Sequence, residues 1–301
     1  MRYYDEATGL YYEIKEDEGR KWALVTDADK KLTKVTVPDS LGGVPVEEIG
    51  KKAFLGCKLL REVTLPGTVR SLGEWALAFC DNLVSVHLPR AGIRLGKGVF
   101  KNDRKLKDIF VYDDSSDEAV SRLLAAAPIY MDAEYLLDIE HAGTCEWYNK
   151  WDTKLTHILS LKDDDGYHLY VLCGEEDLHF DYDQYLEYNR EKKSYLCMLR
   201  LRNDKCLKED VRKDLRDYLL DHTVGCGSDA AIRVLLRDYG DDRDYYELML
   251  DEGVITPLNL ERVLIMMGDR HAQMKAYLME HGGSASAGGE SGDVSFDSLM
   301  L

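Results

Sequence analysis

A 23-residue spacing between residues 60 and 106 constrains this chain more than any other feature. The steps from Leu60 to Leu83 and from Leu83 to Leu106 are 23 residues each, and the step from Leu32 to Leu60 is five residues longer. A fixed period of this length is the signature of a solenoid, in which each short unit buries its apolar side only by stacking on its neighbours. The spacing therefore predicts a short stack of coils.

Each unit contains a short run in which apolar and polar residues alternate. Alternation with β-branched residues predicts a strand with one buried face. A proline after each of the first three runs would end the strand, because proline cannot donate a hydrogen bond to a ladder. The predicted strands are Val35-Thr36-Val37, Val63-Thr64-Leu65, Val86-His87-Leu88 and Ile109-Phe110-Val111.

The repeat resembles a known class of bacterial repeat. The residues that carry the likeness are Val35-Thr36-Val37-Pro38, Ile49-Gly50, Ala53-Phe54, Gly56-Cys57 and Leu60. They are similar to the unit of the BspA-like leucine-rich repeats, and the likeness extends over about residues 10–112, including a hairpin before the first repeat. The resemblance implies a leucine-rich repeat solenoid, and a surface or adhesion role for members that carry an export signal.

The outward side chains of the predicted strands are the candidate partner-binding residues. If Val35, Val63, Val86 and their equivalents face inward, the residues between them form an outward ladder. Solenoids use such regular surfaces for extended contacts, and exposed aromatic and arginine side chains are common anchors. An alternative is that the next domain covers Phe110. The candidate residues are Thr36, Thr64, His87, Arg90 and Phe110.

The net charge of −17 lies in the second half of the chain. Residues 1–112 contain 19 Lys and Arg against 16 Asp and Glu, whereas residues 113–301 contain 20 against 40. Such an acidic body repels phosphate backbones and anionic membranes. The expected partner is therefore a protein, neither nucleic acid nor membrane, and the oligomeric state stays open.

The cysteines favour a reducing compartment. The seven cysteines include no CxxC pair, which argues against a disulfide framework and a structural zinc site. Cys57 and Cys80 occupy the same repeat position and are expected as small buried core residues, with a disulfide between them as the alternative. No signal peptide or membrane span is visible. We expect reduced thiols and a cytoplasmic location.

Residues 113–203 are expected to form a capping helix, a β-hairpin and connecting helices. Residues 117–124 predict a helix that caps the solenoid and ends at Pro128. Residues 155–161 and 167–173 alternate around an Asp-Gly turn, which predicts the hairpin. Four metal-binding side chains fall here, but the two histidines on the hairpin would lie too far apart to share an ion. These side chains are His157, His168, Cys173 and His179.

Residues 204–282 are predicted to be a helical repeat domain. Leu207, Val211, Leu215 and Leu219 have helical spacing, which predicts an amphipathic helix over residues 208–222. Four more helices are delimited by cap residues and glycines. Residues 248–253 and 277–282 match in register, and this helix-pair pattern resembles degenerate ankyrin units.

The chain ends in a Gly/Ser-rich stretch followed by apolar residues. A linker of this composition is flexible, so residues 283–301 are expected to be a flexible tail. Its last eight residues are either a solvated end or a peptide that docks on a partner or on this chain. The apolar docking residues would be Val294, Phe296, Leu299, Met300 and Leu301.

These features together predict an α+β protein without catalytic chemistry. A solenoid over residues 1–112 would be followed by the hairpin region over 113–203, the helical domain over 204–282 and the tail. No nucleophile elbow, zinc-protease, P-loop or dinucleotide motif is present, and no cofactor is expected. The expected function is a non-enzymatic scaffold for protein interaction. The alternatives are an enzyme or small-ligand protein with a site in residues 113–203, and an exported adhesion protein.

Overall fold

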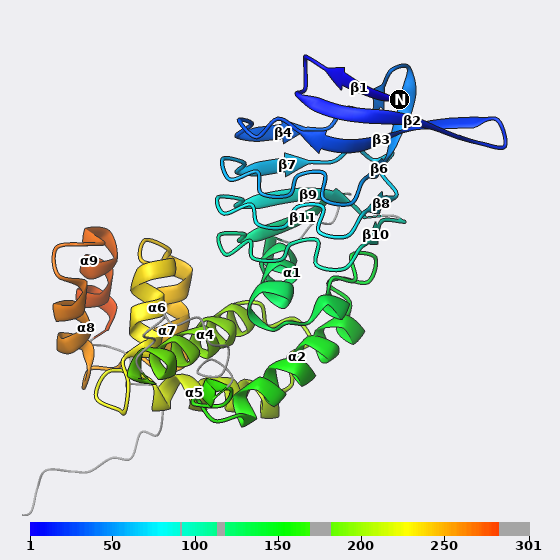
Figure 1. The fold of residues 1–301 in the computed structure, drawn as a ribbon. Coiled ribbons are helices and arrows are strands. Elements are labelled where there is room, and N and C mark those ends of the chain that lie inside the picture. Colours follow the sequence, from blue (N-terminus) through cyan, green and yellow to red (C-terminus); the bar gives the residue numbers. More distant parts are fainter. Residues whose placement is uncertain (91, 113–117, 169–181, 283–301) are drawn as a thin grey trace, which may run out of the picture. The chain divides into compact units, whose positions relative to one another are not determined.

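The structure is a computed structural model that describes residues 1–90, 92–112, 118–168 and 182–282 (Figure 1). The chain forms two compact units. The first contains residues 1–162 and 199–212, and the second contains residues 163–198 and 213–301. The boundaries of these units differ from those of the four segments predicted from the sequence. The division into those four segments stays a prediction. No helix in the described parts of the chain is long and apolar enough to cross a membrane.

The first unit starts with a β-meander that leads into the coils. The predicted hairpin is present as β2 and β3, and β1 adds an antiparallel edge strand. The strands are β1 Arg2–Asp5, β2 Leu10–Asp17, β3 Arg20–Ala28, β4 Lys34–Thr36, β5 Ser40–Leu41, β6 Val44–Ile49, β7 Glu62–Thr64, β8 Ser71–Leu72, β9 Ser85–Pro89, β10 Arg94–Leu95 and β11 Asp108–Tyr112.

The coils form a β-solenoid of about four turns with two sheets. One is a parallel sheet in the order β11-β9-β7-β4, and the other runs β1-β2-β3-β6-β8-β10 with β5 paired to β6. In Figure 1 the strands of the four-stranded sheet lie one above another from blue to green. The expected inward residues Val35, Val63, Val86 and Ile109 are all buried, so the predicted alternation is confirmed.

Helix α1 (Glu118–Tyr130) follows the last strand and packs against β11. The capping helix is therefore present, but its predicted end is wrong, because Pro128 lies inside the helix. Proline donates no amide hydrogen bond and its ring crowds the carbonyl one turn earlier, but α1 ends at Tyr130, so this cost is confined to the last turn. The short 3-10 helix η1 (Glu134–Leu136) follows α1.

The predicted hairpin over residues 155–173 is wrong. Residues 155–160 belong to helix α2 (Cys145–Ser160), whose N-cap Thr144 accepts a hydrogen bond from Trp147 N at 3.2 Å. The buried residues of α2 recur at helical spacing, and this period prevails over the short alternation. They are Trp147, Tyr148, Trp151, Asp152, Leu155 and Ile158. Cys173 of the predicted hairpin lies outside the described residues.

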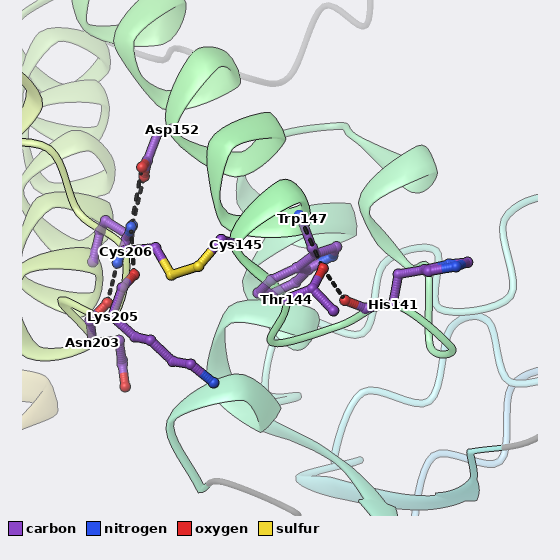
Figure 2. The surroundings of a disulfide bond; sticks show 9 residues. His141, Thr144, Cys145, Trp147, Asp152, Asn203, Lys205 and Cys206 are labelled. Atoms are coloured by element: carbon purple, nitrogen blue, oxygen red, sulfur yellow. Dashed lines mark hydrogen bonds and ion pairs between the residues drawn. A yellow bond between two sulfur atoms is a disulfide. The ribbon is translucent and has the colours of Figure 1, made fainter.

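Residues 199–212 are joined to α2 by a disulfide and a buried ion pair (Figure 2). Cys145 and Cys206 are bonded, with their Cα atoms 5.5 Å apart. The expectation of seven reduced thiols is therefore wrong: spacing along the chain carries no information about two cysteines 61 residues apart that the fold brings together. Arg200 is fully buried, and its Nε donates to Asp152 Oδ1 at 2.5 Å.

The second unit is helical, as predicted. Helix α5 and the four expected helices after it are present. Helix α4 precedes α5 and contains Tyr182, Tyr185 and Tyr188 together with residues 192–202. The helices are α4 Tyr182–Arg202, α5 Glu209–Asp221, α6 Ala230–Asp238, α7 Arg243–Asp251, α8 Leu260–Met267 and α9 Ala272–His281. The ends of α4 and α5 belong to the first unit.

Candidate interaction surface

The predicted outward ladder lies across the four-stranded sheet. Thr36, Thr64, His87 and Phe110 are direct neighbours in the parallel register of β4, β7, β9 and β11. Thr36 is exposed and the other three are half-buried. The 23-residue period predicted this register because equivalent positions of stacked coils must pair. The structure therefore brings four of the five candidate residues together on one face.

A second row of polar residues runs beside the ladder. It consists of Lys34, Glu62, Ser85 and Asp108, again in register. Lys34 Nζ lies 2.8 Å from Glu62 Oε1, and His87 Nε2 lies 3.8 Å from the same oxygen. The row thus contains one cation, Lys34, and two carboxylates, Glu62 and Asp108, which suits a polar protein partner more than an apolar one.

The aromatic end of the ladder is at β11. The rings of His87 and Phe110 stack with centroids 4.8 Å apart and planes 20° from parallel. Each ring covers part of the other, which holds both in place at little further entropic cost on binding. Phe110 is half-buried rather than enclosed. It therefore keeps surface for a partner, although α1 packs against its strand.

Arg90 lies at the edge of this face, directly after β9. It is half-buried, and its Nη1 donates to the Ala142 carbonyl at 3.5 Å. Arg122 of α1 lies 3.7 Å from Asp108, and Ser121 donates to the same carboxylate at 2.9 Å. The sequence pattern did not single out Arg122 or Ser121, because both come from a helix outside the repeat period.

In the core of the solenoid, the third coil has a carboxyl group where the first two coils have a cysteine. Cys57 and Cys80 are buried free thiols, as expected, and burial raises the pKa of each. Asp103 replaces them in the third coil and is fully buried. Burial raises its pKa to about 8, against the hydrogen bond that Cys80 N donates to it at 2.8 Å. Asp103 is therefore part of the buried core and does not belong to the ladder.

The second unit contains a carboxylate surrounded by donors. Lys193 Nζ and Tyr218 Oη lie 2.8 and 3.3 Å from Asp163 Oδ1, and Arg190 Nε and His222 Nε2 lie 3.2 and 3.4 Å from Oδ2. Burial would raise the pKa of Asp163, but the hydrogen bonds from His222 and Lys193 hold it well below its usual range. Arg190 and Lys193 are three residues apart in α4, and Tyr218 of α5 is four residues before His222, which directly follows that helix. Residues at this spacing lie on one side of a helix, and the spacing is visible in the sequence.

This cluster bears on the enzyme alternative for residues 113–203. A general base must be free to accept a proton from a substrate. Asp163 instead already accepts from four neighbours and has a lowered pKa, so it links side chains of α4 with Tyr218 of α5 and with His222. Within the described ranges no cluster of three or more His, Cys, Asp or Glu side chains could hold a metal ion.

The glycine-rich residues 225–228 lie directly before the start of α6. Ser228 Oγ accepts a hydrogen bond from Ala230 N at 3.1 Å and lies 3.3 Å from Glu187. Cys226 is exposed.

The docking tail with Val294, Phe296, Leu299, Met300 and Leu301 lies outside the described residues, as does His179. The tail hypothesis stays a prediction.

Comparison with known proteins identifies the coils. Residues 28–119 match the family model described as the BspA type leucine-rich repeat region, in 6 copies. This segment is therefore a BspA-type leucine-rich repeat region, as its residues predicted. The likeness of residues 204–282 to ankyrin units stays a prediction. No curated protein matches the chain.

Several solved structures of bacterial leucine-rich repeat proteins are similar to part of the chain. A leucine-rich repeat protein of T. pallidum is 31% identical over 33% of this chain and 46% of its own, with a TM-score of 0.30. A leucine-rich cell surface protein of Faecalibacterium prausnitzii is 23% identical over 37% and 32%, with a TM-score of 0.31. One from Bacteroides ovatus is 26% identical over 34% and 28%, with a TM-score of 0.30. The chain spans less than half of each of these three structures.

Proposed function

We propose that the protein is a non-enzymatic interaction module that binds a protein partner through the strand face of its solenoid. The observation that supports this most is the ladder Thr36, Thr64, His87 and Phe110, whose register is continuous over four strands. Leucine-rich repeat regions in general mediate protein interactions, and a regular strand surface suits an extended contact. The partner would meet a face of mixed charge with one aromatic end.

The experiment compares partner capture with small-molecule binding. The intact chain is used to isolate partners from its native lysate, and the same protein is screened against a metabolite panel by thermal shift. A specific protein partner without a metabolite shift supports the proposal. A shift of several degrees with a metabolite, without a protein partner, favours the alternative of an enzyme or small-ligand protein.

A double variant then places the site. Replacing His87→Ala removes the ring stacked on Phe110, and Arg90→Glu reverses the charge at the edge of the face. We expect this variant to weaken capture about tenfold, the loss of one moderate anchor. Thermal unfolding of the variant is the control for folding, because Arg90 also contacts the Ala142 carbonyl. Unchanged affinity in a folded variant would move the site to the helical unit.

The location is proposed from the cysteine pairing. The prediction of a cytoplasmic protein depended on reduced thiols, and the Cys145–Cys206 bond removes that support. Disulfides persist in oxidising compartments and are rare in the cytosol. We therefore favour an oxidising compartment, which is compatible with the alternative of a surface protein. Alkylation of thiols in intact cells before lysis decides: Cys145 and Cys206 stay unmodified in an oxidising compartment and react in the cytosol.

A further inference from the structure

The outer turns of the coils form a second regular surface. These turns are residues 51–56, 74–79 and 97–102, each of which follows an apolar–glycine pair. Backbone hydrogen bonds join successive turns: Lys52 N to Glu74 O at 3.0 Å, Trp75 N to Lys97 O at 3.1 Å and Phe79 N to Lys101 O at 2.8 Å. The side chains of Lys51 and Glu74, at equivalent positions of two turns, form an ion pair at 2.6 Å. Side chains that are 23 residues apart therefore lie side by side on this surface.

Two positions in each turn have a left-handed backbone. The first is occupied by Lys52, Trp75 and Gly98, and the second by Gly56, Phe79 and Asn102, all with φ between 56° and 66°. Glycine and asparagine are the residues that favour this conformation, and other side chains pay roughly 1–2 kcal/mol. The second coil alone places aromatic side chains at both positions. Backbone strain of this kind is concentrated at functional sites.

Both aromatic side chains keep surface open to solvent. Trp75 is 36% exposed and Phe79 is 37% exposed. The Trp75 indole lies against Gly98 of the next coil, where an added Cβ would come within 2.7 Å of the ring. Lys52 and Lys101 place their ammonium groups 5.1 and 5.9 Å from the ring centroid. The indole is thus held in a fixed orientation between two cations.

The charge around Trp75 is positive although the chain as a whole is acidic. Lys51 Nζ lies 2.6 Å from Glu74, and its hydrogen bond lowers the pKa of Glu74, with further lowering by the charges of Lys97 and Lys52. Glu74 is therefore surrounded by three lysines, and Lys101 adds a fourth cation beside the indole. A second carboxylate, that of Glu134, accepts a hydrogen bond from Gly98 N at 2.9 Å, so cations still outnumber carboxylates here. The balance of charge on this surface is opposite to that of residues 113–301.

We propose that this surface, the lysine–tryptophan patch, is a second binding site, and that it takes an acidic protein segment that carries an apolar or aromatic side chain. The patch consists of Lys51, Lys52, Trp75, Phe79, Lys97 and Lys101. The lysines supply attraction for carboxylates, and the fixed rings supply an apolar anchor at low entropic cost. The site is separate from the strand ladder, so it would let the solenoid hold two partners.

The test measures binding of a labelled peptide to the full chain by fluorescence anisotropy. The probe is a synthetic peptide of alternating Asp or Glu and Phe or Leu, and its control has Asn and Gln in place of the acids. The variant Lys52→Glu/Lys101→Glu should weaken binding of the acidic peptide at least tenfold, and Trp75→Ala should weaken it by a similar factor. The charge-matched control Lys21→Glu/Lys150→Glu, at exposed positions elsewhere on the first unit, should leave it unchanged.

Each other outcome overturns the proposal. Equal binding by the neutral peptide, or equal losses in the patch variant and the charge-matched control, would show that the patch does not select acidic segments. Concentration-dependent dimerisation of the full chain that Lys52→Glu/Lys101→Glu abolishes would show that a second copy occupies the patch. The charge variants keep the test valid if Trp75→Ala lowers the thermal midpoint, because Lys52 and Lys101 are exposed.

Discussion

At the scale of single residues, one position of the repeat makes the stability of the solenoid depend on pH. Asp103 takes the position of Cys57 and Cys80, and its Oδ2 has no hydrogen-bond partner among the described residues. A carboxyl group in such a site keeps its proton, which agrees with a pKa raised to about 8. The repeat pattern showed that this coil departs from the others, but only the structure shows that the aspartate is fully buried.

This burial predicts a pH-dependent stability of the solenoid. The folded state retains a proton on Asp103 that the unfolded chain releases near pH 4, so stability falls as the pH rises from about 4 to about 8. Asp103→Asn keeps the acceptor for Cys80 N and does not titrate. The variant should be more stable than the parent at pH 8, by a few kcal/mol at most, with a flatter profile. Urea unfolding at a series of pH values measures the free energy of unfolding of both proteins. The prediction is contradicted if this free energy changes equally with pH in the variant and in the parent.

The ladder was predictable at this scale, and the charged neighbours were not. Thr36, Thr64, His87 and Phe110 could be aligned from the period alone, because stacked coils impose a common register. The contacts of Asp108 with Ser121 and Arg122 come from a helix without a period shared with the coils. Contacts of this kind depend on how the chain folds back in space, and the spacing of residues along the sequence does not predict that path.

At the scale of elements, the main disagreement concerns residues 145–161. The alternation in residues 155–161 suggested a strand, yet the buried residues of α2, from Trp147 to Ile158, extend over about three turns at helical spacing. A long periodic pattern is a stronger signal than a short one, and a strand of seven residues is a weak competitor. The five helices from α5 onward were predictable, because each has an apolar period and clear terminators.

The disulfide joins residues 199–212 of the first unit to α2. Cys145 and Cys206 close a loop of 61 residues, and the chain-entropy model assigns about 4 kcal/mol to such a link. Cys145→Ala/Cys206→Ala should therefore lower the unfolding midpoint by several degrees under non-reducing conditions. Cys57→Ala/Cys80→Ala is a control for the loss of two thiols: it keeps the Cys145–Cys206 bond, so reductant should lower its midpoint as it lowers the parent's, whereas Cys145→Ala/Cys206→Ala should not respond to reductant. A double variant that matches the parent under oxidising conditions would contradict the pairing.

The carboxylate cluster of the second unit gives a prediction of opposite sign in pH. Asp163 has a lowered pKa, so its contribution is present above about pH 4 and is lost as the pH falls. Asp163→Asn should destabilise the unit by roughly 2–4 kcal/mol at neutral pH, because four donors lose a charged partner. The neighbouring exposed Asp165→Asn is the matched control. Chemical denaturation at pH 7 and at a series of pH values below about 4 should show the full loss at pH 7 and a difference between variant and parent that shrinks as the pH falls toward the lowered pKa of Asp163.

At the scale of the whole molecule, an essentially neutral repeat unit is combined with an acidic helical one. The sequence predicted this order of elements, and the repeat family of residues 28–119 agrees with it. The attachment of residues 199–212 to α2 within the first unit was not predictable, because it depends on the buried Arg200–Asp152 pair and on the disulfide. Such a return of the chain leaves no local pattern.

The tail prediction belongs to this scale. Residues 283–293 have a linker composition, and about ten such residues let the apolar end reach roughly 15–20 Å from α9. Deleting residues 284–301 should leave the thermal midpoint unchanged while altering self-association or partner capture. Sedimentation and capture assays measure this. Identical behaviour of the truncated and full chains, with random-coil amide signals for the tail in the presence of partner, would show a solvated end only.

The most direct test of the central claim is the affinity of the captured partner for a chain with a blocked strand face. Thr36→Arg/Thr64→Arg places two bulky cations at neighbouring ladder positions whose side chains point outward. The account predicts that the dissociation constant, measured by titration calorimetry, rises at least tenfold, or about 1.4 kcal/mol. Lys21→Glu/Lys150→Glu, outside the ladder, should bind like the parent. A folded ladder variant with the parent's dissociation constant would contradict the claim that the strand face binds the partner.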